Sequence, residues 1–224
     1  MGVPDDTYFG EKPEGGGIKY GGVRAITNDQ RKLELLKTRL DVLLIKQTSE
    51  IAKRDEEGKP IIWSPFSLCV LTLLSIETLG RVLSDMEKIK KESDFEQSKK
   101  VVTPIYRMMD KDLDKKPSKG FYKGFELIHG TSDKKSIKKY SHVIHKYQRN
   151  TFNHGYQAKG VYLDHTGTPF WQLMEKEGFM VINPYLFWDR FVETFNSAFE
   201  EILNPKDKKY RTNALKFFHE LIWE

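Results

Sequence analysis

The residues that could do chemistry lie together in one short segment of the chain, Arg149-Asn150-Thr151-Phe152-Asn153-His154-Gly155-Tyr156. Asn150 and His154 are four residues apart, so a helix would project both side chains from the same side. Histidine titrates near neutral pH and transfers protons, whereas arginine offers a planar, permanently charged fork that matches a phosphate group. Together they supply what metal-free cleavage of RNA requires. A base activates the attacking 2′-hydroxyl, and a cation stabilises the charge that develops on the phosphoryl oxygens.

Basic residues lead up to this segment. The chain of 224 residues carries 37 Lys and Arg against 32 Asp and Glu, a net charge of +5, which alone is weak support for a polyanionic partner. The placement of the lysines is more informative, and we expect five of them to contact nucleic acid: Lys134, Lys135, Lys138, Lys139 and Lys146. A solvated lysine-rich surface without a ligand is the alternative interpretation, and it stays open.

Other kinds of reactive site find less support in the sequence. The chain has no Gly-x-Ser-x-Gly, no His-Glu-x-x-His and no Walker phosphate-binding loop. His142 and His145 are three residues apart and could share a metal ion on one helix face, but no third ligand follows at a fixed spacing. We therefore expect two surface histidines, no metal and no cofactor. Cys69 is the only cysteine, so a disulfide within the chain and a cysteine-based zinc site are excluded.

The segment resembles a known motif. Arg149-Asn150-x-x-x-His154 is similar to the Arg-x(4–6)-His signature of HEPN ribonucleases, in which a polar residue commonly follows the arginine. Gly155 and Tyr156 extend it to the Arg-x4-His-x-Tyr of HEPN toxins from toxin–antitoxin pairs. The apolar helix around residues 76–80 also looks like the central helix of such proteins. The resemblance implies a helical bundle, usually a homodimer whose two motifs share a cleft, and metal-independent RNA cleavage in prokaryotic defence or stress.

Carried over residue by residue, the resemblance gives a role to each side chain of the motif. Arg149 would stabilise the phosphate, His154 would be the acid or base, and Asn150 would orient one of the two. Tyr156 would be a modification site, to which a partner nucleotidyltransferase acting as antitoxin adds AMP. The small toxins of this type lack the β-prone segment before residue 183 and the last helix, and the chain departs from them there.

Three interpretations of the motif stay open. In the first, the protein is an endoribonuclease. In the second, it is a non-catalytic HEPN-like module that binds nucleic acid, a nucleotide or a protein partner. In the third, Arg149, Asn150 and His154 only cap backbone carbonyls or complement the dipole at a helix end. The sequence alone therefore leaves open whether the protein is an enzyme.

The elements that must position this segment are mainly helical. Apolar residues at helical spacing predict helices over about 29–57, 64–86 and 95–109. The second of these starts at a capping Ser64 and a favourable Pro65, and Pro104 permits a kink in the third. A loop or short helix follows over 120–128, and a helix that begins near Ser132-Asp133 leads into the motif. Two more helices, over about 184–204 and 207–223, complete the chain.

Two short β-prone runs, 161–163 and 179–182, predict a small sheet or hairpin with a long connection. The predicted fold class is therefore mainly α: an HEPN-like helical bundle with a small β-hairpin insertion, about residues 160–183, before the late helices. Residues 28–224 form a single domain, and residues 1–27, rich in Gly, Pro and Asp, form a flexible segment. The helix that begins at Pro65 is apolar on most sides. We place it at the centre of the bundle or in a dimer interface. Glu77 within it is a candidate buried carboxylate, although a solvent-facing edge is the favoured position.

The start of the chain lacks the basic and apolar regions of a signal peptide. The longest apolar run, around residues 71–74, is too short to span a bilayer. We therefore expect a cytoplasmic protein with no membrane partner.

Overall fold

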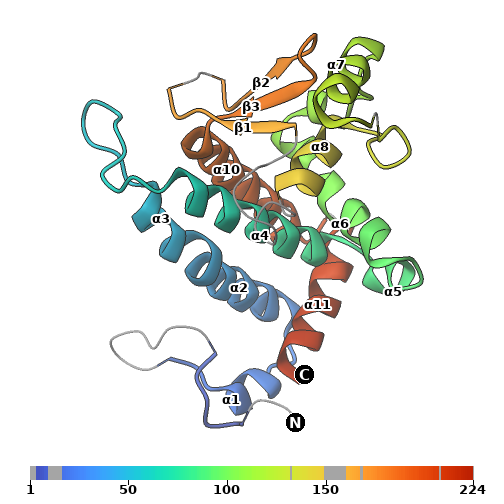
Figure 1. Cartoon of the computed structure of the whole chain (residues 1–224). Coiled ribbons are helices and arrows are strands. Elements are labelled where there is room, and N and C mark those ends of the chain that lie inside the picture. Colours follow the sequence, from blue (N-terminus) through green and yellow to red (C-terminus); the bar gives the residue numbers. More distant parts are fainter. Residues whose placement is uncertain are drawn as a thin grey trace.

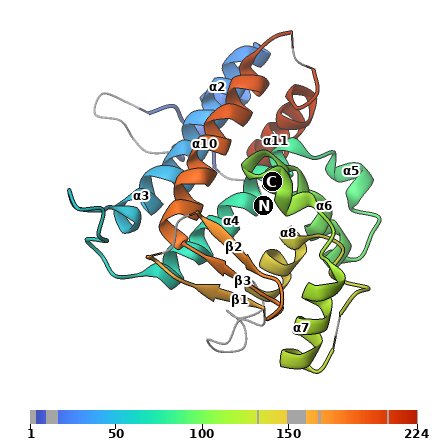
Figure 2. The same ribbon diagram turned by 90° about the horizontal axis from the view of Figure 1, so that it is seen from above.

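Helices make up most of the structure. The computed structural model describes residues 4–9, 17–131, 133–148, 160–166, 169–206 and 208–223. Long helices cross one another around a central helix, and a small sheet lies at one end of the bundle (Figures 1 and 2). Three helices lie near this sheet: α7 (Lys119–His129), α8 (Tyr140–Val143) and the start of α10 (Pro184–Leu203). The prediction of a mainly α fold is confirmed.

The first long helical run covers residues 29–52. It consists of α2 (Asp29–Leu40), the π-helical η1 (Asp41–Lys46) and α3 (Gln47–Ala52). Asn28 caps it by accepting a hydrogen bond from the backbone N–H of Arg31 at 2.9 Å. The predicted end near Glu57 is too late. The Asp55 carboxylate accepts the N–H groups of Glu57 and Lys59, and this local bonding folds the chain into a turn instead of a further helical turn.

Helix α4 (Pro65–Leu83) is the central helix, packed between α10 and α6 (Asp94–Met109). Pro65 occupies its first turn as predicted, although the side chain of Ser64 does not cap it, and the helix ends at Leu83 rather than near residue 86. Gly80 permits the close approach of α4 to α6, because a Cβ at this position would overlap the carbonyl oxygen of Val101.

Within the described part of the chain, α4 is the one helix long and apolar enough to cross a membrane. The prediction considered only the uninterrupted apolar run and so overlooked the whole helix. Most of α4 is buried inside the protein, as in the core helix of a soluble protein. Glu77 lies between the two predicted positions, a buried carboxylate and a solvent-facing edge. Its side chain is only 14% exposed and pairs with Arg81 at 3.5 Å.

Helix α6 follows the short α5 (Met86–Ile89), matches the predicted helix over 95–109 and contains Pro104. The 3-10 turn η2 (Lys111–Asp114) and α7 come next. The predicted loop or short helix over 120–128 is thus a helix. Ser118 caps it by accepting the N–H of Phe121 at 3.0 Å, and Gly130 ends it in the left-handed conformation.

The sheet differs from the predicted hairpin. β1 (Val161–Leu163) and β3 (Phe179–Ile182) are the two predicted strands, but they pair in parallel, with Val161 opposite Met180. The hairpin is instead formed by β2 (Trp171–Met174) and β3, which pair antiparallel across a turn that Gly178 closes with a φ of 70°. The strand order is β1-β3-β2. Strand β2 was not predicted, because Trp-Gln-Leu-Met is short and contains no β-branched residue.

The helix before the motif is shorter than predicted. It begins with α8 at Tyr140 and continues as the π-helical η3 (Ile144–Gln148). Asp133 instead starts a turn, in which its carbonyl oxygen accepts the N–H groups of Ser136 and Ile137 at 3.0 and 2.9 Å. Ser132, the other predicted capping residue, lies outside the described residues.

Helices α10 and α11 (Arg211–Trp223) complete the bundle. Asn183 caps α10 by accepting the N–H groups of Tyr185 and Leu186 at 3.0 and 3.3 Å, and Pro184 follows it as predicted. Four phenylalanines at helical spacing on α10 are fully buried: Phe187, Phe191, Phe195 and Phe199. Helix α11 begins at Arg211 rather than near residue 207.

Part of the predicted flexible segment is folded. Helix α1 (Tyr20–Arg24) contacts α11, and Phe9, Tyr20 and Val23 are buried. The ring of Phe9 lies edge-on to that of Phe218 on α11, with centroids 5.8 Å apart. The described residues among the first 27 therefore differ from a flexible tail, because their aromatic side chains have an apolar surface to pack on.

Candidate functional site

The predicted catalytic motif lies outside the described residues. Arg149, Asn150, His154 and Tyr156 all fall within residues 149–159, so the site can be built only as far as Gln148, which immediately precedes the motif. The described residues do include the helix that leads into the motif, the lysines predicted to bind nucleic acid, and the pockets near them.

Buried side chains hold the helix that leads into the motif. Every residue from Tyr140 to His145 is buried. Ser98 on α6 forms a 2.5 Å hydrogen bond with Nε2 of His145, and the ring of Tyr140 meets that of Phe121 edge-on, with centroids 5.5 Å apart. The π-helical η3 is a type of turn that occurs frequently at functional sites. These contacts hold α8 and the start of η3 against α6 and α7.

His142 and His145 were predicted to be surface residues, and this prediction is wrong. Their side chains are 6% and 3% exposed. The helical face that carries them packs on α6 instead of facing water. Among the residues that the structure describes, no group of three histidine, cysteine, aspartate or glutamate side chains is placed to hold a metal ion.

His142 is neutral at physiological pH. Its pKa is lowered to about 4, first by burial and then by the positive charges of Lys99 and Lys139. A hydrogen bond with the backbone of Ser136 and the carboxylate of Glu96 oppose this shift but do not outweigh it. The ring also accepts the backbone N–H of Lys138 at Nδ1, so both of its nitrogens have backbone partners.

The five lysines predicted to contact nucleic acid divide into two groups. Two of them are half-buried and ion-paired, Lys139 with Asp114 and Lys146 with Asp133. Burial would raise the pKa of Asp114, but hydrogen bonds from Lys139 and Arg107 outweigh it and lower that pKa, so the carboxylate is charged at neutral pH. The other three are exposed: Lys134, Lys135 and Lys138. The two ion pairs tie the segment around α8 to neighbouring parts of the fold, and the three exposed lysines present their charges on the surface, where a polyanion could contact them.

A basic pocket lies between α6 and the start of α8. It has a volume of about 260 Å³, and its polar lining consists of Glu96, Lys99, Lys100, Thr103, Lys139 and His142. The Lys99 side chain is only 5% exposed and donates to Glu96 at 2.7 Å, whereas Lys100 pairs with Glu92 outside the lining. Lys99 and Lys100 were not predicted as site residues, because they are far from the motif along the chain. The available signal was an adjacent pair of lysines on the predicted helix over 95–109.

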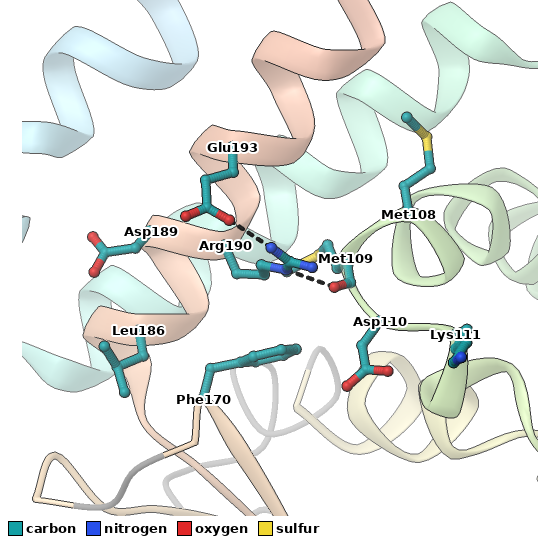
Figure 3. A pocket seen from close by; sticks show the side chains of 9 residues that line it. All are labelled: Met108, Met109, Asp110, Lys111, Phe170, Leu186, Asp189, Arg190 and Glu193. Carbon is teal, nitrogen blue, oxygen red and sulfur yellow. Dashed lines mark hydrogen bonds and ion pairs between the residues drawn. The ribbon is translucent and has the colours of Figure 1, made fainter.

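A larger pocket, of about 700 Å³, lies between the end of α6 and α10 (Figure 3). Four of its charged side chains form bonds within the protein: Asp110, Asp189, Arg190 and Glu193. Arg190 donates to the carbonyl oxygen of Met109 and to Glu193, both at 2.6 Å, and Asp110 accepts the indole N–H of Trp171 at 2.9 Å. These bonds tie α10 and β2 to the end of α6, and we therefore assign this pocket a structural role.

Comparison of the chain with family models, with curated proteins and with solved structures finds no match. What the protein does must therefore be inferred from its own residues.

Proposed function

We propose that this protein is a metal-independent endoribonuclease of HEPN type, with Arg149 and His154 as its catalytic pair. The observation that carries the proposal is the Arg-x4-His-x-Tyr motif, which begins at the residue after η3. The mainly helical fold is compatible with it. Buried contacts on α8 and η3 supply the rigid support that a catalytic arginine and histidine require.

In the proposed reaction, His154 takes the proton of a ribose 2′-hydroxyl, and the resulting oxygen attacks the adjacent phosphorus. The bond from phosphorus to the 5′ oxygen breaks, and that oxygen leaves as a hydroxyl after taking up a proton. The other product ends in a 2′,3′-cyclic phosphate. Arg149 stabilises the charge on the phosphoryl oxygens in the transition state, and Asn150 orients one of the two catalytic groups.

The exposed lysines support RNA as the substrate. Lys134, Lys135 and Lys138 lie on the segment that leads into α8, and none of them forms an ion pair with another described residue. Contacts between such lysines and phosphates would make binding weaken as salt increases. We therefore expect Lys134→Ala and Lys138→Ala each to weaken RNA binding and to reduce its dependence on salt.

Assembly and regulation belong to the same proposal. The homodimer is proposed from the resemblance alone, because a single exposed apolar residue on α4, Leu74 at 53%, is ordinary for a protein surface. A strict monomer at micromolar concentration in light scattering would contradict a shared cleft.

Tyr156 is the proposed site at which a partner nucleotidyltransferase adds AMP. The intact mass of the protein after co-expression with such an enzyme tests this proposal. We also propose a cytoplasmic location.

The deciding experiment measures cleavage of a mixed single-stranded RNA in EDTA. The wild type should cleave, and His154→Ala should lower the rate at least about 100-fold, the lower limit for a lost general acid or base. His165→Ala, which changes an exposed histidine after β1, is the matched control and should cleave like the wild type. Activity that disappears in EDTA and returns with magnesium, or that survives in His154→Ala, would contradict the proposal.

A second candidate function is a non-catalytic module that binds nucleic acid, a nucleotide or a protein partner. The observation that favours it is the basic surface, since the exposed lysines and the basic pocket could bind an anion without any cleavage. Salt-dependent binding of RNA by wild type, with no product in any buffer, would favour this function over the ribonuclease.

A further inference from the structure

We infer that the basic pocket between α6 and α8 is a phosphate-binding site, formed by Lys99, Lys100, Lys139 and His142. Nothing in the motif is needed for it, so it stands whether or not the protein cleaves RNA. Under the proposed function, it would hold a phosphate of the RNA away from the bond that is cleaved.

Two elements form the walls of this pocket. On α6, Glu96, Lys100 and Thr103 recur at intervals of four and three residues, the spacing that places side chains on one face of a helix. Lys139 and His142, three residues apart, form the opposite wall. The volume of about 260 Å³ is just below the roughly 300–1,000 Å³ typical of pockets for drug-sized ligands. It suits a single phosphate group, either free or at the end of a larger molecule.

The lining has an excess of positive charge. The lining holds three lysines and one carboxylate, that of Glu96. Lys100 and Lys139 also pair with Glu92 and Asp114, which lie outside the lining, so a bound phosphate would share these two cations with their carboxylates. Lys99 is the most buried of the three, and its charged form is held by Glu96, which is itself 44% exposed. A phosphate in the pocket would place a second negative group beside the buried Lys99 ammonium. Charge-assisted hydrogen bonds from the lysines would compensate the phosphate for its loss of hydration.

The electrostatic environment of His142 supports the same conclusion. The positive charges of Lys99 and Lys139 affect its pKa more than the negative charge of Glu96 does, so the net field at the imidazole is positive. An anion bound beside the ring would reverse this field and raise the pKa of His142. The imidazole is therefore a built-in reporter of phosphate binding.

Lys138 links the pocket to the exposed surface. Its charge helps to lower the pKa of Glu96, after the larger effect of the hydrogen bond from Lys99, so it lies near this edge of the pocket. A nucleotide or RNA strand whose phosphate enters the pocket would continue toward Lys138. Free phosphate, a nucleotide and a polymer share the chemistry of this site, and the experiment must distinguish them.

The experiment follows the imidazole resonances of His142 by NMR, in the whole protein, at increasing concentrations of three probes. These are inorganic phosphate, 5′-AMP and a short single-stranded oligodeoxynucleotide. The oligodeoxynucleotide has no 2′-hydroxyl and so cannot be cleaved by the proposed reaction, which separates binding from catalysis. We expect a saturable change at His142, with its pKa raised by the bound probe, and the probe that binds most tightly identifies the source of the phosphate.

Removing a positive charge and removing a negative charge from the lining should have opposite effects on affinity, and this tests the assignment. Lys100→Ala should weaken binding about tenfold, as expected for one charge-assisted hydrogen bond, and Glu96→Gln should tighten it several-fold. Lys208→Ala removes the same charge from the connection between α10 and α11 and should leave binding unchanged. Circular dichroism of each variant checks that it is folded.

Three results would overturn the site: no saturable change at His142 with any probe, equal weakening by Lys208→Ala, or unchanged affinity in Lys100→Ala. His154→Ala should bind the probes like the wild type. A protein that binds them but cleaves no RNA would therefore retain this site and lose only the proposed ribonuclease function.

Discussion

Replacing His142 by glutamine should remove a pH-dependent part of the protein's stability. The folded protein keeps this imidazole neutral, because burial and the charges of Lys99 and Lys139 disfavour a proton on it more than Glu96 and the Ser136 backbone favour one. In the unfolded chain the same histidine has an ordinary pKa near 6.5. Between about pH 6.5 and 4 the unfolded state therefore binds more protons than the folded state, and stability falls as the pH falls.

The size of this effect follows from the two pKa values. The difference between 6.5 and about 4 corresponds to roughly 3 kcal/mol, at about 1.36 kcal/mol for each pKa unit. This contribution is fully present above about pH 6.5 and is lost as the pH falls to about 4. The carboxylates of the protein titrate in part of the same range, so the effect must be measured as a difference between two proteins that differ only at His142.

The assay is urea unfolding of wild type and His142→Gln at several pH values from 7.5 to 4. The free energy of unfolding of the wild type should fall by roughly 3 kcal/mol more than that of the variant over this range. His165→Gln is the control, because it replaces an exposed histidine. The free energy of unfolding of this variant should change with pH in parallel with that of the wild type. If wild type and His142→Gln give parallel curves, the burial of a neutral imidazole beside two lysines is the wrong explanation.

Two further substitutions test how α4 and α6 support this region. Gly80→Ala should destabilise by about 2 kcal/mol, because overlap with the backbone of Val101, about 3 kcal/mol, outweighs the roughly 1 kcal/mol by which alanine favours a helix. The melting temperature of Gly80→Ala should fall by roughly 4–8 °C. Gly120→Ala is the control, because a Cβ there would lie 3.5 Å from its nearest neighbour, Ser118 Oγ, and it should lower the melting temperature little or not at all. Equal melting temperatures for the two variants would refute the clash. Ser98→Ala should lose about 1–2 kcal/mol in urea unfolding, because the buried imidazole of His145 loses this hydrogen bond, and a loss below about 0.5 kcal/mol would count against that anchor.

Local signals predicted the helices well where they were strong. Pro65 and the Asn183-Pro184 pair marked the starts of α4 and α10, and apolar spacing located α6 closely. These features depend on the backbone and on neighbours within one or two turns, which the sequence displays directly. The Asp55 turn was missed because the Asp55 carboxylate binds nearby backbone N–H groups and so competes with helix formation. The late start of α8 was missed because the N–H of Tyr140 bonds to the distant carbonyl of Lys115.

The candidate site divides in the same way. The motif from Arg149 to Tyr156 is predicted from spacing and residue type alone, and it stays a prediction because it lies outside the described residues. The basic pocket could not be recognised, because Lys99 and His142 belong to helices far apart in the chain. The burial of His142 and His145 was also hidden, since two histidines at helical spacing look the same on a wet face and on a packed one.

By itself, then, the sequence determined the helical class, the starts of the principal helices and the position of the motif, because each of these depends on residues close together in the chain. Only the tertiary structure decided which strands pair, since β1 meets β3 in parallel with β2 beyond it. It also decided which lysines are paired with carboxylates and which histidines are buried. Strand pairing, ion pairing and burial all depend on contacts between segments that are distant in the sequence. Contacts of this kind also bring the lysines of the basic pocket together.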